Sequence, residues 1–439
     1  MKVRLPYSKK KRYLTGIDWI IVALDSMNRR ATGGTNASQI VLELSGAVDD
    51  NRFCAAVAEF TQLFPVLGGR STRCWNLAPY WKMPRPGKRV PVTVETFNVA
   101  APEILSALER SVNTAFAEAN EHLAFRVFHA GADHHYIAMH FNHRLFDAQG
   151  AEAFLDLFHS WYRGEDCRAR IERIALTEPA HLCDWKRKFE AGTQLVRMLR
   201  EFAKTPPLVL PRPSPLKGRS FKFSVMEFNG QEAKAINDRA CRESGFLMFL
   251  PYALASAVQV LDAAFHARGA KGQDYIVSVS VDMRTPDTAA ARLFFNNVSF
   301  LFFRVSSAIA GNRKQVMETV RTQMYEQIKS GFPRALHESS MVMRILPASV
   351  LSRLLLWPLN GEFASLGLTC VGKGGDRPSK FMDADVVNLF HMPLVPVPPG
   401  IGFFVNQFGD RMNVVLSYVD GMLSDADVQQ FRADIRRWL

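Results

Sequence analysis

The sequence predicts an α/β (α+β) protein made of two halves of similar length. Two observations lead to this prediction: strand patterns and amphipathic helix patterns mix in each half, and a segment with five prolines lies near the middle. Proline lacks the N–H that helices and sheets use, so residues 205–218 should form an extended crossover. We therefore expect an N-terminal subdomain at 1–204 and a C-terminal subdomain at 219–439.

The first half begins with a strand at Ile40–Leu44, followed by Asp49 or Asp50 as the cap of a helix. The apolar residues of that helix fall on one face, and Pro65 ends it. In the second half, Tyr275–Met283 and Val298–Val305 have the composition of buried strands. Further patterns indicate strands at 221–225, a helix around 316–328, a hairpin that turns at Gly409 and Asp410, and a last helix that begins at Ser424.

Composition and charge narrow the functional classes. The chain has 439 residues with 48% hydrophobic and 22% charged side chains, enough to bury a large core without disulfides or metals. The net charge of +12 favours an anionic partner, such as an acidic membrane surface, an acidic carrier protein or a phosphorylated co-substrate. No nucleic-acid signature is found, so we expect no nucleic-acid partner.

Cysteine spacing, the first residues and the most apolar stretch indicate where the protein resides and whether it binds zinc. Six cysteines lie far apart with no Cys-x-x-Cys pair, which argues against a zinc site and a secreted disulfide framework. The basic first residues lead into more charge and not into an apolar signal core. The most apolar stretch, Met341–Leu359, contains two arginines and a proline, so it should not span a membrane. We expect a cytoplasmic protein.

The most informative segment runs from Leu123 to Trp161. Two predicted strands, Leu123–Ala130 and His135–Phe141, are followed by a loop at 142–150 and then by a helix with one apolar side. His143 thus stands at the end of a strand, and Asp147 follows four residues later, just before a helix.

This arrangement resembles the chloramphenicol-acetyltransferase-like and condensation-domain superfamily. Its members, which include plant-type acyl-CoA-dependent acyltransferases, wax ester synthases and polyketide-associated acyltransferases, share the motif His-His-x-x-x-Asp-Gly in the same setting. The second His matches His143 and the Asp matches Asp147, whereas Asn142 replaces the first His and Ala148 replaces the Gly. The segments at 14–18, 281–284 and 296–299 also resemble the family, so the resemblance covers nearly the whole chain.

The resemblance implies two similar subdomains with an active-site tunnel between them and an acyltransferase without a bound cofactor. The co-substrate would be an acyl-CoA or a phosphopantetheine thioester, and His143 would be the general base. Asp147 would brace the loop through Arg284 or Arg70. Asn142 would orient the loop, and Gly150 would supply flexibility that Ala148 lacks.

Candidate oxyanion or tunnel contacts are Asn297 and Ser417, with Asn413 and Tyr418 as further possibilities near the hairpin. We expect a monomer that acts on a small-molecule or lipid acceptor, with an acyl carrier protein as a possible partner.

Several alternatives stay open at this point. His140, His143 and Asp147 have a spacing that metal ligands can show, although His140 falls within a strand pattern. The basic amphipathic segment 184–204 either packs on the body of the protein or lies on an anionic membrane. Residues 372–376 are glycine-rich but lack P-loop spacing, which favours a flexible loop. The rival functions are a stand-alone condensation enzyme that forms an amide between carrier-bound partners, and an inactive docking relative.

Overall fold

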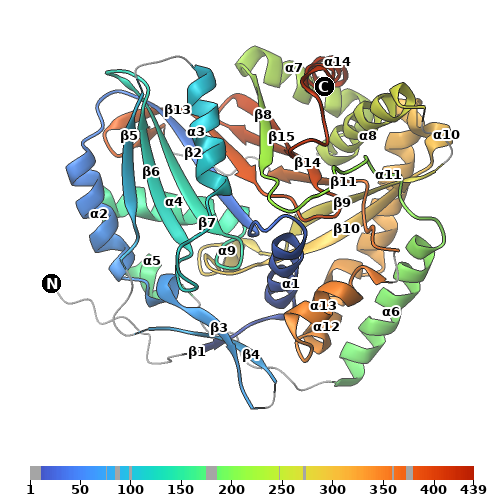
Figure 1. The fold of residues 1–439 in the computed structure, drawn as a ribbon, viewed down its shortest axis with the longest axis horizontal. Helices are drawn as coiled ribbons and strands as arrows, with labels where there is room; N and C mark the ends of the chain where they lie inside the picture. Colours follow the sequence, from blue (N-terminus) through green and yellow to red (C-terminus); the bar gives the residue numbers. More distant parts are fainter. Residues whose placement is uncertain are drawn as a thin grey trace.

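The computed structural model describes residues 11–439 except position 76 and residues 85–88, 98–100, 175–184, 247, 270–272, 358–359 and 372–378. Two six-stranded sheets form the two halves, which lie side by side with helices packed on their faces (Figure 1). The predicted architecture of mixed sheets flanked by helices is confirmed. The glycine-rich segment 372–376 lies outside the described residues.

The first sheet has the strand order β12 (Lys380–Phe381), β13 (Ala384–Pro393), β2 (Ala37–Ser45), β7 (His134–Asn142), β6 (Leu123–His129) and β5 (Val92–Thr96). The second has the order β10 (Val298–Val305), β9 (Tyr275–Asp282), β11 (Leu366–Val371), β14 (Ile401–Phe408), β15 (Arg411–Val419) and β8 (Phe221–Phe228). A small third sheet joins β1 (Lys11–Tyr13), β4 (Pro79–Lys82) and β3 (Arg70–Arg73).

The helices that flank the first sheet are α2 (Asp50–Gln62), α3 (Ala101–Asn113), α4 (Ala148–Tyr162) and α5 (Arg168–Glu172), with a short 3-10 turn η1 (Pro65–Gly68). The others are α1 (Gly16–Ala31), α6 (Trp185–Ala203), α7 (Gly230–Ser244), α8 (Phe249–Ala267), α9 (Pro286–Ala289), α10 (Ser307–Ala310), α11 (Arg313–Lys329), α12 (Phe332–Met343), α13 (Ala348–Leu354) and α14 (Asp425–Trp438). The predicted caps at Asp49 and Ser424 are confirmed, because each side chain accepts a backbone N–H of its helix.

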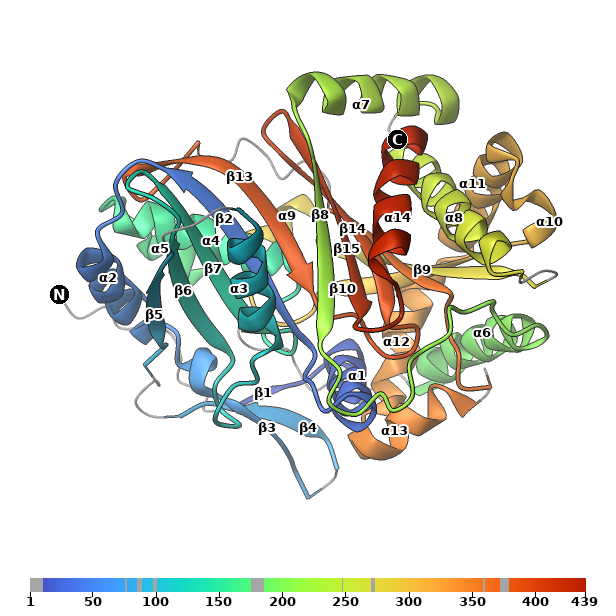
Figure 2. The ribbon, with the colours of Figure 1, turned by 45° about the horizontal axis from the view of Figure 1, so that its top comes forward.

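One segment of the C-terminal part of the chain joins the sheet of the first half. β12 and β13 come from the C-terminal part of the chain but belong to the first sheet, where β13 pairs antiparallel with β2 (Figure 2). The sequence did not indicate this crossover. It places the free edge of β13 against the second sheet.

Side chains of the second sheet satisfy the carbonyls along that edge. The Leu389 carbonyl accepts the Nδ2 groups of Asn406 and Asn413 at 2.7 and 2.9 Å, and the Pro393 carbonyl accepts the Ser417 hydroxyl at 2.9 Å. Buried carbonyls need such partners. The polar residues of β14 and β15 therefore join the two sheets.

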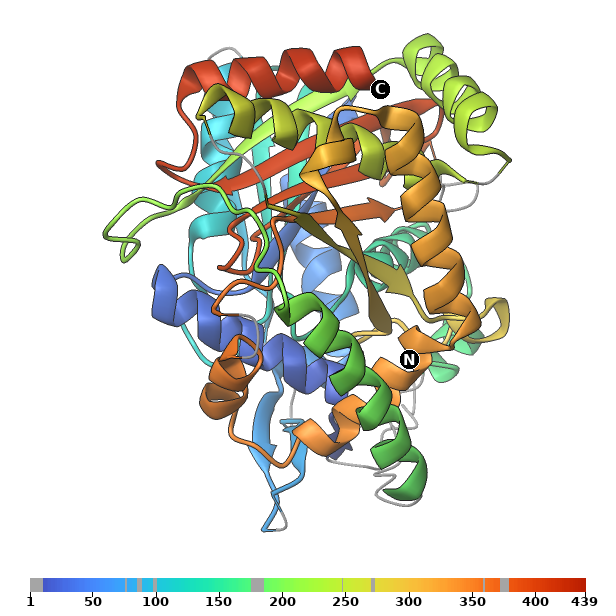
Figure 3. The same cartoon turned by 90° about the vertical axis from the view of Figure 1, so that its right-hand side faces the viewer.

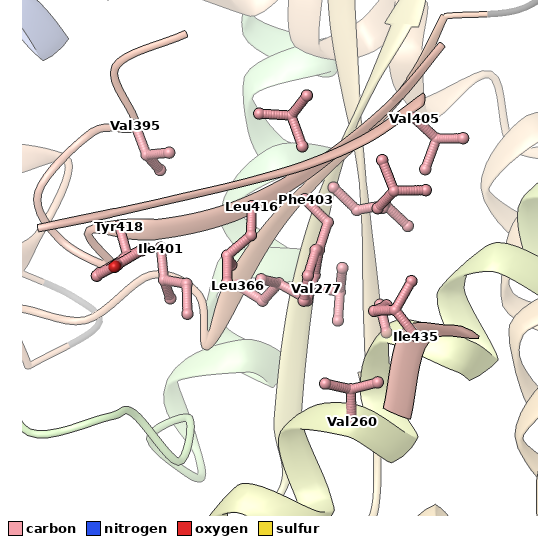
Figure 4. Packing of buried hydrophobic residues seen from close by; sticks show 14 of the residues in the cluster. Val260, Val277, Leu366, Val395, Ile401, Phe403, Val405, Leu416, Tyr418 and Ile435 are labelled. Atoms are coloured by element: carbon pink, nitrogen blue, oxygen red, sulfur yellow. The ribbon is translucent and has the colours of Figure 1, made fainter. Parts of the chain in front are cut away.

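The larger hydrophobic core lies in the second half. Val277, Leu366, Phe403 and Leu416 of the sheet pack together with Val260 of α8 and Ile435 of α14 (Figure 4). The same cluster extends to Val41 and Ala138 of the first sheet, so the halves share one apolar interior. In the described part of the chain, no single helix has the length and apolar character needed to cross a membrane, although the bent pair α7–α8 meets that test by length and composition.

Helix α1 connects the two halves through its contacts with helices of the C-terminal part of the chain. Thr15 and Asp18 form a capping box at its N-terminus, and α1 packs beside α12 and α13 near α6 (Figure 3). Gly16 lies against Ser340 of α12 so closely that a Cβ at this position would overlap the Ser340 backbone.

We expect Gly16→Ala to lower the free energy of unfolding by about 1–3 kcal/mol, because overpacking a rigid contact forces the helices apart. Chemical denaturation measures the change. The matched control is Gly192→Ala in α6, where a Cβ meets nothing within 4 Å, and it should keep or slightly raise stability. Equal stability of the Gly16 variant and the native protein would show that α1 and α12 can separate without cost.

Candidate active site

An apolar cavity of about 320 Å³ lies between the two halves. Its walls come from β2, β7 and β13 of the first sheet, from β9, β10, β11 and β14 of the second, and from the N-terminus of α4. Helices α1, α6 and α12 add aliphatic side chains, among them Ile20, Leu195 and Leu336. The lining is therefore mostly apolar, with a few polar groups placed within it.

His143 lines this cavity directly after β7 ends. The loop is held on both sides, because Asn142 N–H donates to the His122 carbonyl at 2.9 Å and His143 N–H donates to the Asn36 carbonyl at 3.0 Å. The predicted strand–loop–helix setting of His143 is thus present, with α4 starting at Ala148.

The orientation of the His143 ring is set by Asn296, which comes from the second half. The Asn296 Nδ2 donates to the His143 carbonyl at 2.9 Å, so its Oδ1 is an acceptor, and this oxygen lies 3.1 Å from the His143 Nδ1. An acceptor at this position requires the proton on Nδ1. Nε2 then carries the lone pair and is the nitrogen left for a molecule in the cavity.

Burial lowers the pKa of His143 from its usual value. Three weaker effects raise it: a hydrogen bond to the residue's own backbone, the negative charge of Asp147 and the bond to Asn296. The imidazole is therefore neutral at neutral pH. A neutral ring with a free Nε2 has the protonation state that a general base needs.

Asp147 borders the cavity, and its carboxylate bonds with the second half. Its carboxylate accepts the Arg284 Nη2 at 2.8 and 3.0 Å and the Asn297 N–H at 2.8 Å. It also caps α4 by accepting the Gly150 N–H at 2.8 Å. Of the two candidate arginines, Arg284 is the one that pairs with Asp147, whereas Arg70 lies exposed on β3.

The motif's two departures have clear structural places. Asn142 is buried, and its Oδ1 accepts the Arg144 N–H at 3.0 Å, which closes the turn that carries His143. Ala148 is the first helical residue of α4, where a Cβ is accommodated without strain. Gly150 has ordinary helical backbone and not the flexibility that we expected; it is needed because a Cβ there would overlap the Leu293 carbonyl.

Asn296 and Asp18 are site residues whose roles the sequence did not indicate. The Asp18 Oδ1 accepts the Asn296 N–H at 3.0 Å, and the same buried carboxylate pairs with Arg12 at 2.9 Å. Asp18 thus holds the residue that orients His143. The sequence offered residues 14–18 only as a family resemblance, and it did not indicate the long-range bond to Asn296.

The proposed oxyanion residues lie elsewhere. Asn297 donates its backbone N–H to Asp147. Ser417 of β15 is fully buried, and its hydroxyl donates to the Pro393 carbonyl of β13. Neither residue is among the described residues that line the cavity. Asn413 bonds to Asn388. Cavity hydroxyls come instead from Ser278, Ser280 and Thr369, and the last two lie 3.1 Å apart.

The metal alternative does not match the geometry. His140 stacks on Phe116 at 4.5 Å and is fully enclosed, and burial together with Arg126 lowers its pKa to about 3. It does not join His143 and Asp147. Within the described ranges, no group of three or more His, Cys, Asp or Glu side chains could hold a metal ion.

Helix α6 forms most of the basic amphipathic segment 184–204, for which the sequence left open packing on the protein body or contact with a membrane. It packs beside α12, and Leu195 is buried at the cavity wall. Phe189 and Val196 on the same helix are exposed. The helix is therefore part of the body of the protein, and membrane contact stays a prediction.

Comparison with known proteins gives the fold a context. No protein-family model matches the chain, and no curated protein matches its sequence. Among solved structures, a trichothecene 15-O-acetyltransferase from Fusarium sporotrichioides superposes with a TM-score of 0.70 at 14% identity, over 98% of this chain and 95% of that chain. The first condensation domain of the calcium-dependent antibiotic synthetase, in complex with a substrate analogue, gives 0.66 at 15% identity, over 97% and 95%.

A third neighbour is the starter condensation domain of rhizomide synthetase in complex with C8-CoA, with a TM-score of 0.64 at 11% identity over 98% of this chain and 93% of that chain. At these identities the likeness establishes the fold. The chain has the fold of condensation domains and of the trichothecene acetyltransferase, and the resemblance drawn from the motif is confirmed at that level.

We expect Asp147→Asn to lower the free energy of unfolding by about 1–3 kcal/mol, because the buried Arg284 then keeps only Asp282 as a carboxylate partner. Thermal and urea unfolding measure the loss. The control is Asp383→Asn, which breaks the exposed pair with Arg52 and should cost about 0–1 kcal/mol. Similar losses in both variants would mean that the Asp147–Arg284 pair does not hold the halves together.

Proposed function

We propose that the protein transfers an acyl group from an acyl-CoA or acyl-carrier-protein thioester to a hydroxyl or amine acceptor. The observation that carries this proposal is the His143 ring, whose Nδ1 is held by Asn296 so that a neutral Nε2 is presented to an enclosed apolar cavity. The likeness to an acetyltransferase and to a condensation domain in complex with C8-CoA supports it.

His143 would act as the general base. Its Nε2 takes the proton of the acceptor hydroxyl or amine as the acceptor attacks the thioester carbonyl, and the collapse of the tetrahedral intermediate releases the thiol. The thioester is already activated, so the reaction needs no enzyme nucleophile. The imidazolium formed returns its proton to the leaving thiolate.

Asp147, Arg284 and Asn142 support this base without touching it. The Asp147–Arg284 pair ties the start of α4 to the segment that carries Asn296, and Asn142 closes the turn. For the oxyanion, the cavity hydroxyls of Ser278, Ser280 and Thr369 replace Asn297 and Ser417 as candidate donors.

The character of the cavity favours an apolar acyl chain. Aliphatic and aromatic side chains dominate its walls, and transfer of methylene groups from water into such a space contributes about 0.8 kcal/mol for each CH₂. The net charge of +12 suits a phosphorylated donor, either CoA or a phosphopantetheine arm.

Thiol release tests the proposal. The protein is incubated with octanoyl-CoA or an octanoyl-loaded carrier protein, with and without 1-hexanol or hexylamine. We expect thiol release that requires the acceptor and, by mass spectrometry, no acyl adduct on the protein. Turnover only with loaded carriers and amines would favour the condensation enzyme, and silence with every pair would favour the docking relative.

We expect His143→Ala to lower kcat about 10²–10⁴-fold with little change in the KM for the thioester, because the base is lost and the cavity is kept. The matched control is His134→Ala at the exposed start of the same strand, which should retain normal turnover. Near-normal turnover of the His143 variant would remove this residue from the mechanism.

The pH profile gives an independent check of the same assignment. The lowered pKa of His143 keeps the base neutral through pH 6.5, so kcat/KM should hold there and fall only as the pH drops through the lowered value. A fall that began above pH 6.5 would contradict the burial of the ring.

A further inference from the structure

A second histidine lines the same cavity and lies on β13, the C-terminal strand that belongs to the first sheet. His391 of β13 is buried, and its Nε2 lies 2.6 Å from the Glu152 Oε1 of α4. Glu152 is equally buried, so the pair sits between the first sheet and α4. The mechanism proposed above does not use either residue.

The carboxylate determines which ring nitrogen faces a ligand. A carboxylate accepts hydrogen bonds, so Glu152 holds a ring proton on Nε2, and in the tautomer with a single ring proton the lone pair is on Nδ1. Nδ1 is therefore an acceptor, and it belongs to a side chain that borders the cavity.

A second acceptor lies on the facing strand. Asn406 of β14 is 2% exposed and lines the cavity, and its Nδ2 donates to the carbonyl of Leu389, two residues before His391. This bond identifies the other amide atom as Oδ1. The Oδ1 is buried and has no hydrogen-bond partner among the residues that the structure describes. A buried acceptor without a partner costs free energy unless a ligand supplies the donor.

We propose that His391 and Asn406, with Glu152 as the positioning residue of His391, form a polar subsite for a hydrogen-bond donor group of a substrate. The donor is a hydroxyl or amine N–H that is separate from the atom that reacts at His143. This inference rests on the proposed function, because it assigns a second recognition element to the same cavity.

Glu152 lies five residues after Asp147 on α4, a rise of about 7.5 Å along the helix axis. This rise gives the length scale for the test substrates, which carry a second donor about that far from the reacting atom. A chain of roughly six carbons spans such a gap.

Paired substrates test the subsite and identify which substrate carries the donor group. One arm compares 1-hexanol with 1,6-hexanediol as acceptors for octanoyl-CoA, and the other compares hexanoyl-CoA with 6-hydroxyhexanoyl-CoA as donors to 1-hexanol. We expect the native enzyme to favour the hydroxylated member of one pair roughly tenfold in kcat/KM, mainly through KM. Equal kcat/KM in both arms would overturn the proposal.

Variants locate the preference. In His391→Phe and in Glu152→Met, which removes the acceptor for Nε2, the ratio should fall toward one, while the control His159→Phe should keep it. His159 is a buried histidine of α4 that bonds to the Met382 N–H and is not among the described cavity-lining residues. Retention of the ratio in His391→Phe would assign the preference to another wall.

A measurement without turnover separates this proposal from the proposed function. Saturation-transfer NMR with the His143→Ala protein reports binding directly for two pairs, 1,6-hexanediol with 1-hexanol and 6-hydroxyhexanoyl-CoA with hexanoyl-CoA. A preference for a hydroxylated probe that is lost in His143→Ala/His391→Phe supports the subsite even if no acyl transfer is found. No preference for either hydroxylated probe would reject the subsite, whatever the catalytic result.

Discussion

The buried ion pair between Asp147 and Arg284 is the constraint on which the rest of the site depends. It joins the first turn of α4, in the first half, to the segment between β9 and β10 in the second half. Both side chains are almost completely enclosed, and Arg284 is the ion-pair partner that compensates the buried Asp147 charge, while Asp282 also pairs with Arg284. Because Asn297 N–H bonds to the same carboxylate, the pair also fixes Asn296, which orients the base.

In this arrangement the residues that position the base are different from the base itself. Asp147 uses its carboxylate to position backbone and an arginine, and it reaches His143 only through its field. Asp18 does the same from α1, where one carboxylate pairs with Arg12 and receives the Asn296 N–H. Two buried acids therefore support a single neutral imidazole. Since neither acid bonds to the ring, the proton on Nδ1 is held by an amide oxygen and the basicity of Nε2 stays modest.

Elements governed by local chemistry could be predicted from the sequence. The strand–loop–helix around His143, the caps at Asp49 and Ser424, and the hairpin at Gly409 each depend on residues close together in the chain, and the structure contains all of them. The role of Gly150 was misread, because a glycine needed for close approach to another segment looks the same as one needed for flexibility. Asn296, His391 and Asn406 could not be assigned, because their places depend on pairing between distant strands.

The placement of β13 in the first sheet accounts for one polar wall of the cavity. A strand that belongs to one sheet but presents its edge to the other leaves carbonyls at the junction, and Asn406, Asn413 and Ser417 supply their donors. On one face of β13, the His391 side chain points toward α4 and meets Glu152, while the neighbouring Phe390 and Met392 belong to the larger core. The Asn406 amide donates its Nδ2 to β13, and among the described residues its Oδ1 has no hydrogen-bond partner. This oxygen belongs to a residue that lines the mostly apolar cavity. The same contact that seals the two halves thus creates the polar wall of the cavity between them.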